Sequence, residues 1–391
     1  MSKLEDLIAE LCPDGVEFRR IKDTYNRLQG TPITAEKMKK IDNPFGDIRI
    51  FAGGRTVISA LEKDIPNANI TRVPAVLIQS RGVIDAIYYE EPFTFKNEMW
   101  AYTTENRTSV KYLYYVIKHN IHKFRDAASG MGSLPQISLR VTEDFKIPLP
   151  PLPVQREIVR ILDNFTELTA ELTAELTARK KQYEYYRDVV LNFKGQKTKT
   201  IKWMSLGDIG RVSMCKRIMK AETSPDGEVP FFKIGTFGRE PDAYISQEKY
   251  DEYRKAYSHP KKGDVLISAA GTIGRTVIYG GEPAYYQDSN IVWIDNDEKQ
   301  VLNKYLFYCY SMKPWAVSNG GTIARLYNDN ISKAKIPVPP LEEQERIVTI
   351  LDRFDTLCND LASGLPAEIE ARRKQYEYYR DKLLTFKEKM A

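Results

Sequence analysis

The sequence predicts an α+β protein in which two globular mixed α/β domains are separated by two long antiparallel coiled-coil helices, as a pseudo-twofold internal repeat. One observation is a seven-residue stretch that occurs twice, letter for letter, at 182–188 and 375–381. A second is the seven-residue spacing of apolar residues before each copy, which is typical of a coiled-coil helix. A third is that landmarks of the first globular region return in the second, such as Leu-Ile at 77–78 and 266–267.

The first globular region is expected to cover 1–152 and to open with a short amphipathic helix. Extended segments at 73–78 and 86–89 are interrupted by glycine and proline, whereas 110–121 has a helical pattern. The mixture of short extended and helical segments favours an α/β domain. A proline-rich extended segment closes the region and leads into the first long helix.

The first long helix is expected at 153–193. Its apolar residues form two seven-residue ladders offset by four, and they are Ile158, Phe165, Leu172, Tyr186 and Phe193, and Leu162, Leu176, Tyr183 and Val190. Such a helix would be roughly 60 Å long at 1.5 Å per residue. Its apolar seam needs a partner helix. The repeat supplies that partner, so we expect the two long helices to pair.

The second half is expected to repeat this order, with a domain at 194–341 and a second long helix at 342–391. A polar linker at 194–200 begins it. Gln155 to Gln344 is 344 − 155 = 189 residues, whereas Gln182 to Gln375 is 375 − 182 = 193 residues. The second helix is therefore four residues longer than the first.

A break in the second helix is expected near 363–366. The four extra residues overshoot one helical turn by roughly 40°, so an uninterrupted seam would lose its register there. Ser363, Gly364 and Pro366 lie at this point. Glycine tolerates unusual dihedral angles and proline is accepted only near a helix start, so these residues favour a break.

Composition excludes several classes of protein. The net charge is a mild +5, and no apolar run is long enough for a membrane span, so we expect a soluble, cytoplasmic chain. The four cysteines stand far apart without a Cys-x-x-Cys spacing, which argues against a zinc ribbon or a disulfide scaffold.

Catalytic signals are weak. Glycine-rich phosphate loops, a methyltransferase cofactor motif and a Glu-x-Lys nuclease motif are all absent from the sequence. The glycines at 271–274 are better interpreted as a strand corner. His119 and His122 could share a helix face and bind a metal, but no third ligand is evident, so we interpret them as ordinary surface histidines. We expect no catalytic residue, bound cofactor or metal in this chain.

Nucleic-acid binding is more plausible, because basic residues lie beside glycines in turns of both domains. A guanidinium at such a position can reach a base edge or phosphate while the backbone approaches closely. Solvated loop charge is an equally good interpretation of any single residue. The candidates are Arg55, Arg81, Gln136, Lys261, Lys262, Arg275 and Arg325.

The repeated stretch itself is a candidate partner surface. Its tyrosines could stack on nucleic acid, but the heptad pattern favours core and interface positions. Identity between the copies indicates a surface used twice by an identical partner. The candidates are Tyr183, Tyr186, Arg187, Tyr376, Tyr379 and Arg380.

With these motifs the chain resembles the DNA-specificity subunits of type I restriction-modification systems over nearly its whole length. The resemblance rests on the segments at 147–152 and 179–188, on the second copies of both, and on the Leu-Thr-Ala-Glu units of 168–176, which look like that family's four-residue spacer repeat. It implies two target-recognition domains, each reading one half of a split double-stranded DNA site, and helices that set the spacing.

The resemblance further implies partners. Two modification subunits would dock on the helices, bring S-adenosylmethionine and methylate adenine, and restriction subunits with ATP-driven, Mg-dependent activity would join them. It gives no base-reading residue. Two other functions stay open: a coiled-coil protein-interaction scaffold without DNA specificity, and a self-contained methyltransferase, which the missing motifs disfavour.

Overall fold

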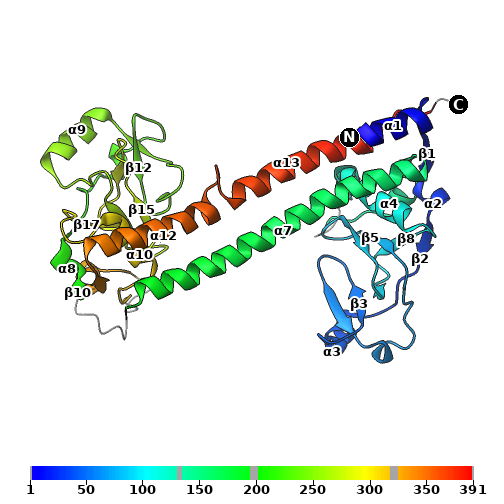
Figure 1. The fold of residues 1–391 in the computed structure, drawn as a ribbon, viewed down its shortest axis with the longest axis horizontal. Helices are drawn as coiled ribbons and strands as arrows, with labels where there is room; N and C mark the ends of the chain where they lie inside the picture. The colour runs from blue at the N-terminus through cyan, green and yellow to red at the C-terminus, as the bar shows by residue number, and fades with distance from the viewer. Residues whose placement is uncertain (1, 130–133, 194–200, 318–324, 390–391) are drawn as a thin grey trace. The chain divides into compact units, whose positions relative to one another are not determined.

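The structure is a computed structural model that describes residues 2–129, 134–193, 201–317 and 325–389. The linker expected at 194–200 lies outside these ranges. The chain divides into two compact units (Figure 1), one formed by Met1–Thr173 with Glu368–Ala391 and the other by Ala174–Ala367. Each unit therefore combines one globular domain with segments from both long helical regions.

The first domain alternates short strands and short helices. In chain order these are α1 (Ser2–Leu11), β1 (Glu17–Arg20), α2 (Ile21–Thr24), β2 (Asn26–Leu28), α3 (Ala35–Ile41), β3 (Ile48–Phe51), β4 (Val57–Ala60), η1 (Glu62–Asp64), β5 (Ala75–Gln79), β6 (Asp85–Tyr89), β7 (Phe93–Phe95), β8 (Trp100–Thr103), α4 (Arg107–His119), α5 (Ile121–Asp126), α6 (Leu139–Glu143) and β9 (Lys146–Leu149).

Three small sheets organise this domain. An antiparallel sheet has the strand order β2-β8-β5-β6, and a second has the order β4-β3-β7 with β3 and β7 parallel. The pair β1-β9 forms the third. Strand β5 is buried along its whole length, as its apolar sequence requires, and α4 packs against β5 and β6. One core cluster thus lies between the four-stranded sheet and α4, and a second, with Phe51, Phe93 and Phe95, covers the other face of β5.

The second domain has its own series of short elements. They are β10 (Lys202–Ser205), α8 (Leu206–Ile209), β11 (Arg211–Ser213), η2 (Lys220–Glu222), β12 (Val229–Phe232), β13 (Tyr244–Ile245), α9 (Gln247–Ala256), β14 (Val265–Ser268), β15 (Thr276–Ile278), β16 (Tyr285–Tyr286), β17 (Ile291–Asp295), α10 (Asn303–Ser311), α11 (Asn328–Lys333) and β18 (Lys335–Val338).

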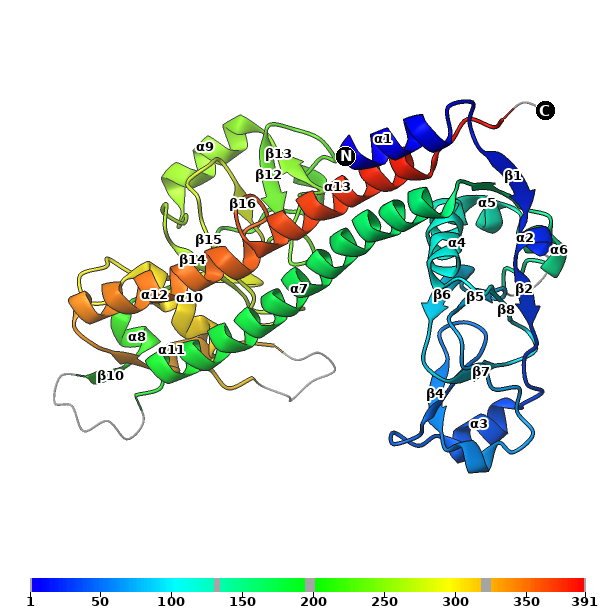
Figure 2. The same cartoon turned by 45° about the vertical axis from the view of Figure 1, so that its right-hand side comes forward.

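The second domain, whose helices α8 to α11 are labelled in Figure 2, repeats the sheet topology of the first. Its sheets have the orders β11-β17-β14-β15, β13-β12-β16 and β10-β18, and β12 and β16 are parallel as β3 and β7 are. Each sheet of one domain therefore has a counterpart of the same order in the other. The predicted α+β fold with an internal repeat is confirmed.

The first long helix is α7 (Leu152–Leu191), one uninterrupted element of 40 residues. Pro153 lies in its first turn, where a missing backbone N–H costs nothing. At its start Ile158 and Leu162 are buried in the core of the first domain, and Glu157 is held by Lys3 at 3.2 Å and Arg160 at 2.6 Å. The helix is anchored to the domain by apolar burial and by this ion pair.

The second helical region consists of two helices, α12 (Leu341–Asn359) and α13 (Leu365–Leu384). The break occupies 360–364, slightly before the expected 363–366. Asp360 holds it, because its side chain accepts the Ala362 backbone N–H at 2.8 Å and its carbonyl accepts that of Gly364 at 3.0 Å. Pro366 lies in the first turn of α13, as its missing N–H requires.

None of the helices within the described ranges is both long and apolar enough to cross a membrane.

Candidate nucleic-acid interface and partner surface

Three predicted residues of the first domain, Arg55, Arg81 and Gln136, converge at one end of the four-stranded sheet. The backbone N–H of Gly54 donates to the Arg81 carbonyl at 3.2 Å, and Arg81 forms an isolated antiparallel bridge with Gln136. Gly82 donates to the Pro135 carbonyl at 2.9 Å. We call this junction of the β3–β4 loop, the β5–β6 turn and the segment before α6 the first corner.

Two glycines permit the close approach of these loops. Gly54 and Gly82 have φ angles of +71° and +79°, a region that side chains rarely adopt. A Cβ on Gly82 would lie only 3.8 Å from the Gly54 Cα, so the two backbones lie against each other. The two arginines were candidates because they lie beside glycines, and these glycines join two loops that are distant in sequence.

Glu98 stabilises the first corner through contacts with Gly53 and Lys96. Its Oε1 accepts the Gly53 backbone N–H at 2.8 Å, and Lys96 Nζ lies 3.0 Å from its Oε2. Burial alone would raise the pKa of Glu98, but the hydrogen bonds from Lys96 and Gly53 and the nearby positive charges outweigh it and lower that pKa. Glu98 therefore stays ionised beneath the corner.

The cations of the first corner are available to a ligand. Arg55 and Arg81 are both exposed, and neither side chain makes a hydrogen bond or ion pair with any residue that the structure describes. Gln136 is also exposed. Two unpaired guanidinium groups and an amide can contact a phosphate or a base edge.

The second domain has a comparable corner at the β14–β15 turn, with Arg275 and Arg325. The turn contains Gly271 and Gly274 at positive φ, +63° and +77°, which agrees with the expected strand corner. Arg275 Nη1 donates to the Phe237 carbonyl at 2.8 Å. Next to Arg325, the Leu326 backbone N–H donates to Ala269 at 2.8 Å, which fixes Arg325 at this turn.

Lys261 and Lys262 are not part of this second corner. They precede β14, whereas the β14–β15 turn follows it, so they lie at the opposite end of that strand. Lys261 Nζ pairs with Asp295 at 2.9 Å, a contact that raises the lysine pKa. The structure therefore separates these two lysines from Arg275 and Arg325.

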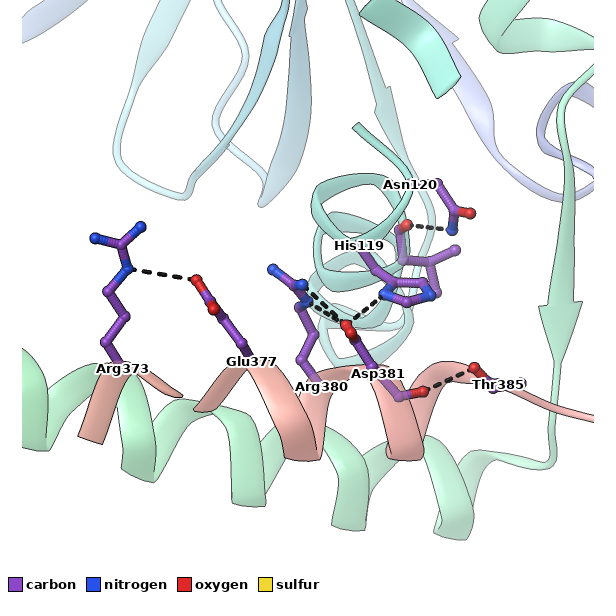
Figure 3. Close-up of polar contacts among 8 residues, drawn as sticks. His119, Asn120, Arg373, Glu377, Arg380, Asp381 and Thr385 are labelled. Atoms are coloured by element: carbon purple, nitrogen blue, oxygen red, sulfur yellow. Dashed lines mark hydrogen bonds and ion pairs between the residues drawn. The ribbon is translucent and has the colours of Figure 1, made fainter. Parts of the chain in front are cut away.

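His119 departs from its predicted role as an ordinary surface histidine, whereas His122 is exposed. Helix α4 ends at His119 and α5 begins at Ile121, so His119 and His122 do not share one helix. His119 is largely buried, and its Nδ1 lies 3.1 Å from Asp381 Oδ1 (Figure 3). No group of three or more potential metal ligands occurs in the described part of the chain.

The repeated stretch lies on the paired helices, and it is used in the same way in each unit. In one unit Tyr379 of α13 stacks on Phe165 of α7, with ring centroids 5.4 Å apart and planes at 23°. In the other, Tyr186 of α7 stacks on Phe354 of α12 at 5.6 Å and 25°. Each copy of the stretch thus packs on the phenylalanine of the opposite helical region, as the apolar ladders predicted.

The remaining candidates of the stretch also match between units. Arg187 and Arg380 each lie over a tyrosine of their own copy, Tyr183 at 6.0 Å and Tyr376 at 5.8 Å. Each arginine also donates two hydrogen bonds to the aspartate that follows it. Burial raises the pKa of Tyr183 to about 12 and also raises that of Tyr376. These four residues are held by the helices rather than presented to solvent.

Tyr185 and Tyr378, which were not among the candidates, are the most exposed tyrosines of the two copies. Their exposed fractions are 67% and 64%, against 40% for Tyr186. Each contacts the next tyrosine edge-on, at 5.7 Å and 5.3 Å. Neither falls on an apolar ladder, so the heptad pattern itself could have identified them as outward-facing.

One contact distinguishes the two copies. Asp381 accepts from Arg380 and also contacts His119, as Figure 3 shows. Burial lowers the pKa of His119, and the neighbouring Asp381 charge opposes that effect. The Lys-Tyr-Leu landmark occurs at 111–113 and 304–306, an offset of 193 that aligns His119 with Met312. The second unit, which contains Asp188, therefore has Met312 where the first unit has His119.

Comparison with known proteins places these features in a family. The type I restriction modification DNA specificity domain matches residues 13–179 and again 198–371. The specificity subunit of the Escherichia coli type I restriction enzymes EcoR124I and EcoR124II is 35% identical over 301 residues, which are 72% of each chain. A Haemophilus influenzae protein, provisionally named as a type I restriction enzyme specificity subunit, is 58% identical over 252 residues. That match covers 62% of this chain and 64% of the relative's length.

Solved structures share the fold. The crystal structure of the S subunit of a type I restriction-modification system from M. genitalium has a TM-score of 0.61 at 14% identity, over 95% of this chain and 96% of that one. A chain from a structural study of complex assembly in a type I system has a TM-score of 0.58 at 18% identity, over 95% and 98%. With two matched domains and these relatives, the chain belongs to the family of type I restriction-modification DNA specificity subunits.

Proposed function

We propose that this chain recognises a bipartite site in double-stranded DNA, with one half read by each globular domain, 1–152 and 194–341. The observation that carries the proposal is the repeated corner. Two domains of identical sheet topology each place arginines at the same hairpin turn, β5–β6 in one and β14–β15 in the other. A scaffold without DNA specificity would not need this duplication.

The corners differ in how tightly their cations are held, and this difference gives them separate roles. Arg55 and Arg81 are exposed, so they can follow a phosphate or enter the major groove on binding. Arg275 is half-buried and bonded to a backbone carbonyl, so it presents its remaining donors in a fixed direction. A fixed guanidinium suits base reading, because bidentate contacts require a defined geometry.

The helical regions would bind the partner subunits. Two copies of one stretch, each with an outward-facing tyrosine and a tyrosine stacked on a phenylalanine, fit two identical modification subunits. Those subunits would bring S-adenosylmethionine, and restriction subunits would bring the ATP- and Mg-dependent activity. The chain itself would then need no cofactor and would act in the cytoplasm, where the DNA is.

DNA binding by the purified complex tests the proposal. Arg81→Ala should weaken binding to the specific duplex by about 1 to 3 kcal/mol if Arg81 reads a base, with less effect on a random duplex. Lys63→Ala removes the same charge from η1 and serves as the matched control. If wild type binds specific and random duplexes with equal affinity at moderate salt, the chain does not supply sequence recognition.

Stoichiometry tests the partner surface. Native mass spectrometry of wild type with excess modification subunit should show two bound copies. Tyr185→Ala and Tyr378→Ala should each weaken one of the two binding steps, because each tyrosine belongs to a different copy of the stretch. A wild-type complex that holds a single modification subunit at saturation would refute the two-site arrangement.

A further inference from the structure

Each domain contains a surface cleft at the same place in its fold. In the first domain the cleft has a volume of about 520 Å³ and is lined by residues that include Gln29, Asn97 and Leu139. In the second domain a cleft of about 710 Å³ is lined by residues that include Met214, Ser289 and Asn328. We call them the first and second clefts.

The three pairs of lining residues occupy matching positions. Gln29 and Met214 each follow the edge strand of the four-stranded sheet, after β2 and β11. Asn97 and Ser289 lie in the turns before β8 and β17. Leu139 and Asn328 are the first residues of α6 and α11, so the clefts are equivalent sites.

Each cleft adjoins the corner of its domain. Asn97 precedes Glu98, which holds Gly53 in the first corner, and Leu139 lies three residues after Gln136. Arg325 belongs to the second corner and also lines the second cleft. The cleft shares Arg325 with the corner in the second domain, and in the first domain residues of the cleft and the corner are neighbours in sequence.

The same position carries different chemistry in the two domains. The side chains of Gln29 and Asn97 are exposed amides that make no hydrogen bond with any described residue. At the matching positions the second cleft has Met214, Ser289 and Asn328 instead, and its lining adds the charged side chains Arg325, Asp329 and Lys333. Arg325 Nη2 donates to the Ser289 carbonyl at 3.0 Å and to its hydroxyl at 3.1 Å, which leaves Nη1 and Nε as donors. Equivalent sites with unlike side chains are expected where two domains read different sequences.

We propose that the two clefts are the base-reading subsites of the two domains. Side-chain amides such as Gln29 and Asn97 pair with the N6 and N7 edge of adenine, whereas arginine pairs with the O6 and N7 edge of guanine. The half-site read by the first domain therefore contains an adenine opposite the first cleft. The half-site read by the second domain contains a guanine opposite Arg325. This inference rests on the proposed function and adds the residues and the bases.

The test is methylation mapping of a host genome that expresses the whole complex with a variant chain. Asn97→Ala should relax one base position in one half-site and leave the other half unchanged, and Arg325→Ala should do the converse. In binding assays, Asn97→Ala and Gln29→Ala should each lose roughly 5- to 150-fold in affinity for the specific duplex and little for a random one. Asn26→Ala, an exposed amide on β2 outside the cleft, is the matched control.

The outcomes separate this inference from the proposed function. If wild type shows no preference for any sequence, the proposed function fails. If wild type is specific but the cleft variants, with unchanged thermal melting, keep its motif and affinity, the clefts do not read bases while the proposed function stands. Equal loss on specific and random duplexes would also overturn the inference, because it would assign the clefts to the DNA backbone.

Discussion

Deleting the four residues 173–176 from α7 should shorten the gap between the two DNA half-sites. Helix α7 is continuous from Leu152 to Leu191, so the deletion shortens the helix by about one turn without interrupting it. Four residues correspond to about 6 Å of rise and about 40° of rotation beyond one full turn. The apolar ladders lose four residues from a seven-residue repeat, so the pairing beyond the deletion must also readjust.

The size of the shift follows from DNA geometry. A rise of about 3.4 Å per base pair converts 6 Å into at most about two base pairs. Bending of the DNA and of the helices shares the change, so we expect a gap shorter by about one base pair. Methylation mapping reports the gap directly. Thr173→Ala with Glu175→Ala, which keeps the length, is the control and should keep the wild-type gap.

The result that would refute this reasoning is specific. If the deletion variant methylates the original motif with the original gap at full activity, helix length does not set the spacing. A variant that folds, binds each half-site duplex alone and methylates no bipartite site would instead show that the 40° rotation cannot be absorbed. That outcome would show that the rotation of α7 about its axis, rather than its length, limits which gaps are accepted.

Two further predictions concern stability. Burial lowers the pKa of His259 to about 4, against about 6.5 in an unfolded chain. The folded protein therefore binds a proton at His259 less readily than the unfolded chain does. The free energy of unfolding should fall as the pH drops from 6.5 to 4, by at most about 3 kcal/mol. His259→Gln should flatten this pH dependence of stability in acid titrations followed by circular dichroism, whereas His122→Gln should not. An unchanged slope in the His259 variant would contradict the prediction. Gly364→Ala should lower the melting temperature by a loss of about 1 to 3 kcal/mol, because the new Cβ would lie 2.5 Å from the Thr356 carbonyl oxygen. An unchanged melting temperature would show that the break tolerates a side chain.

The sequence predicted the helices well, because their signal is local and long. Phe165, Tyr186, Phe354 and Tyr379 were placed on apolar ladders or in the repeated stretch, and in the structure they form the two stacked pairs. The helix break was predicted from a difference of four residues together with Ser363, Gly364 and Pro366. Such patterns span many residues, so the misassignment of one residue changes little.

The corners were harder to predict, because they depend on contacts between segments that are distant in sequence. That Arg55, Arg81 and Gln136 lie together follows only from the register of strands β3 to β6 and from the segment before α6. A glycine beside an arginine marked each residue as a turn but could not say which turns meet. The same pattern therefore selected Lys261 and Lys262, which lie at the other end of β14.

The two stacked pairs also explain why the second helical region must be interrupted. On α7, Phe165 and Tyr186 are 186 − 165 = 21 residues apart, three heptads, which is about 31 Å of helix. Their respective stacking partners, Tyr379 and Phe354, are 379 − 354 = 25 residues apart. A continuous helix would place them about 6 Å farther apart than the contacts on α7 allow. The non-helical residues 360–364 lie between Phe354 and Tyr379, so the extra length is absorbed there and both copies keep the same packing. Two identical stretches on helical regions of unequal length thus require a break between the two stacked pairs. A change in the length of α7 should therefore alter the conformation of residues 360–364 first.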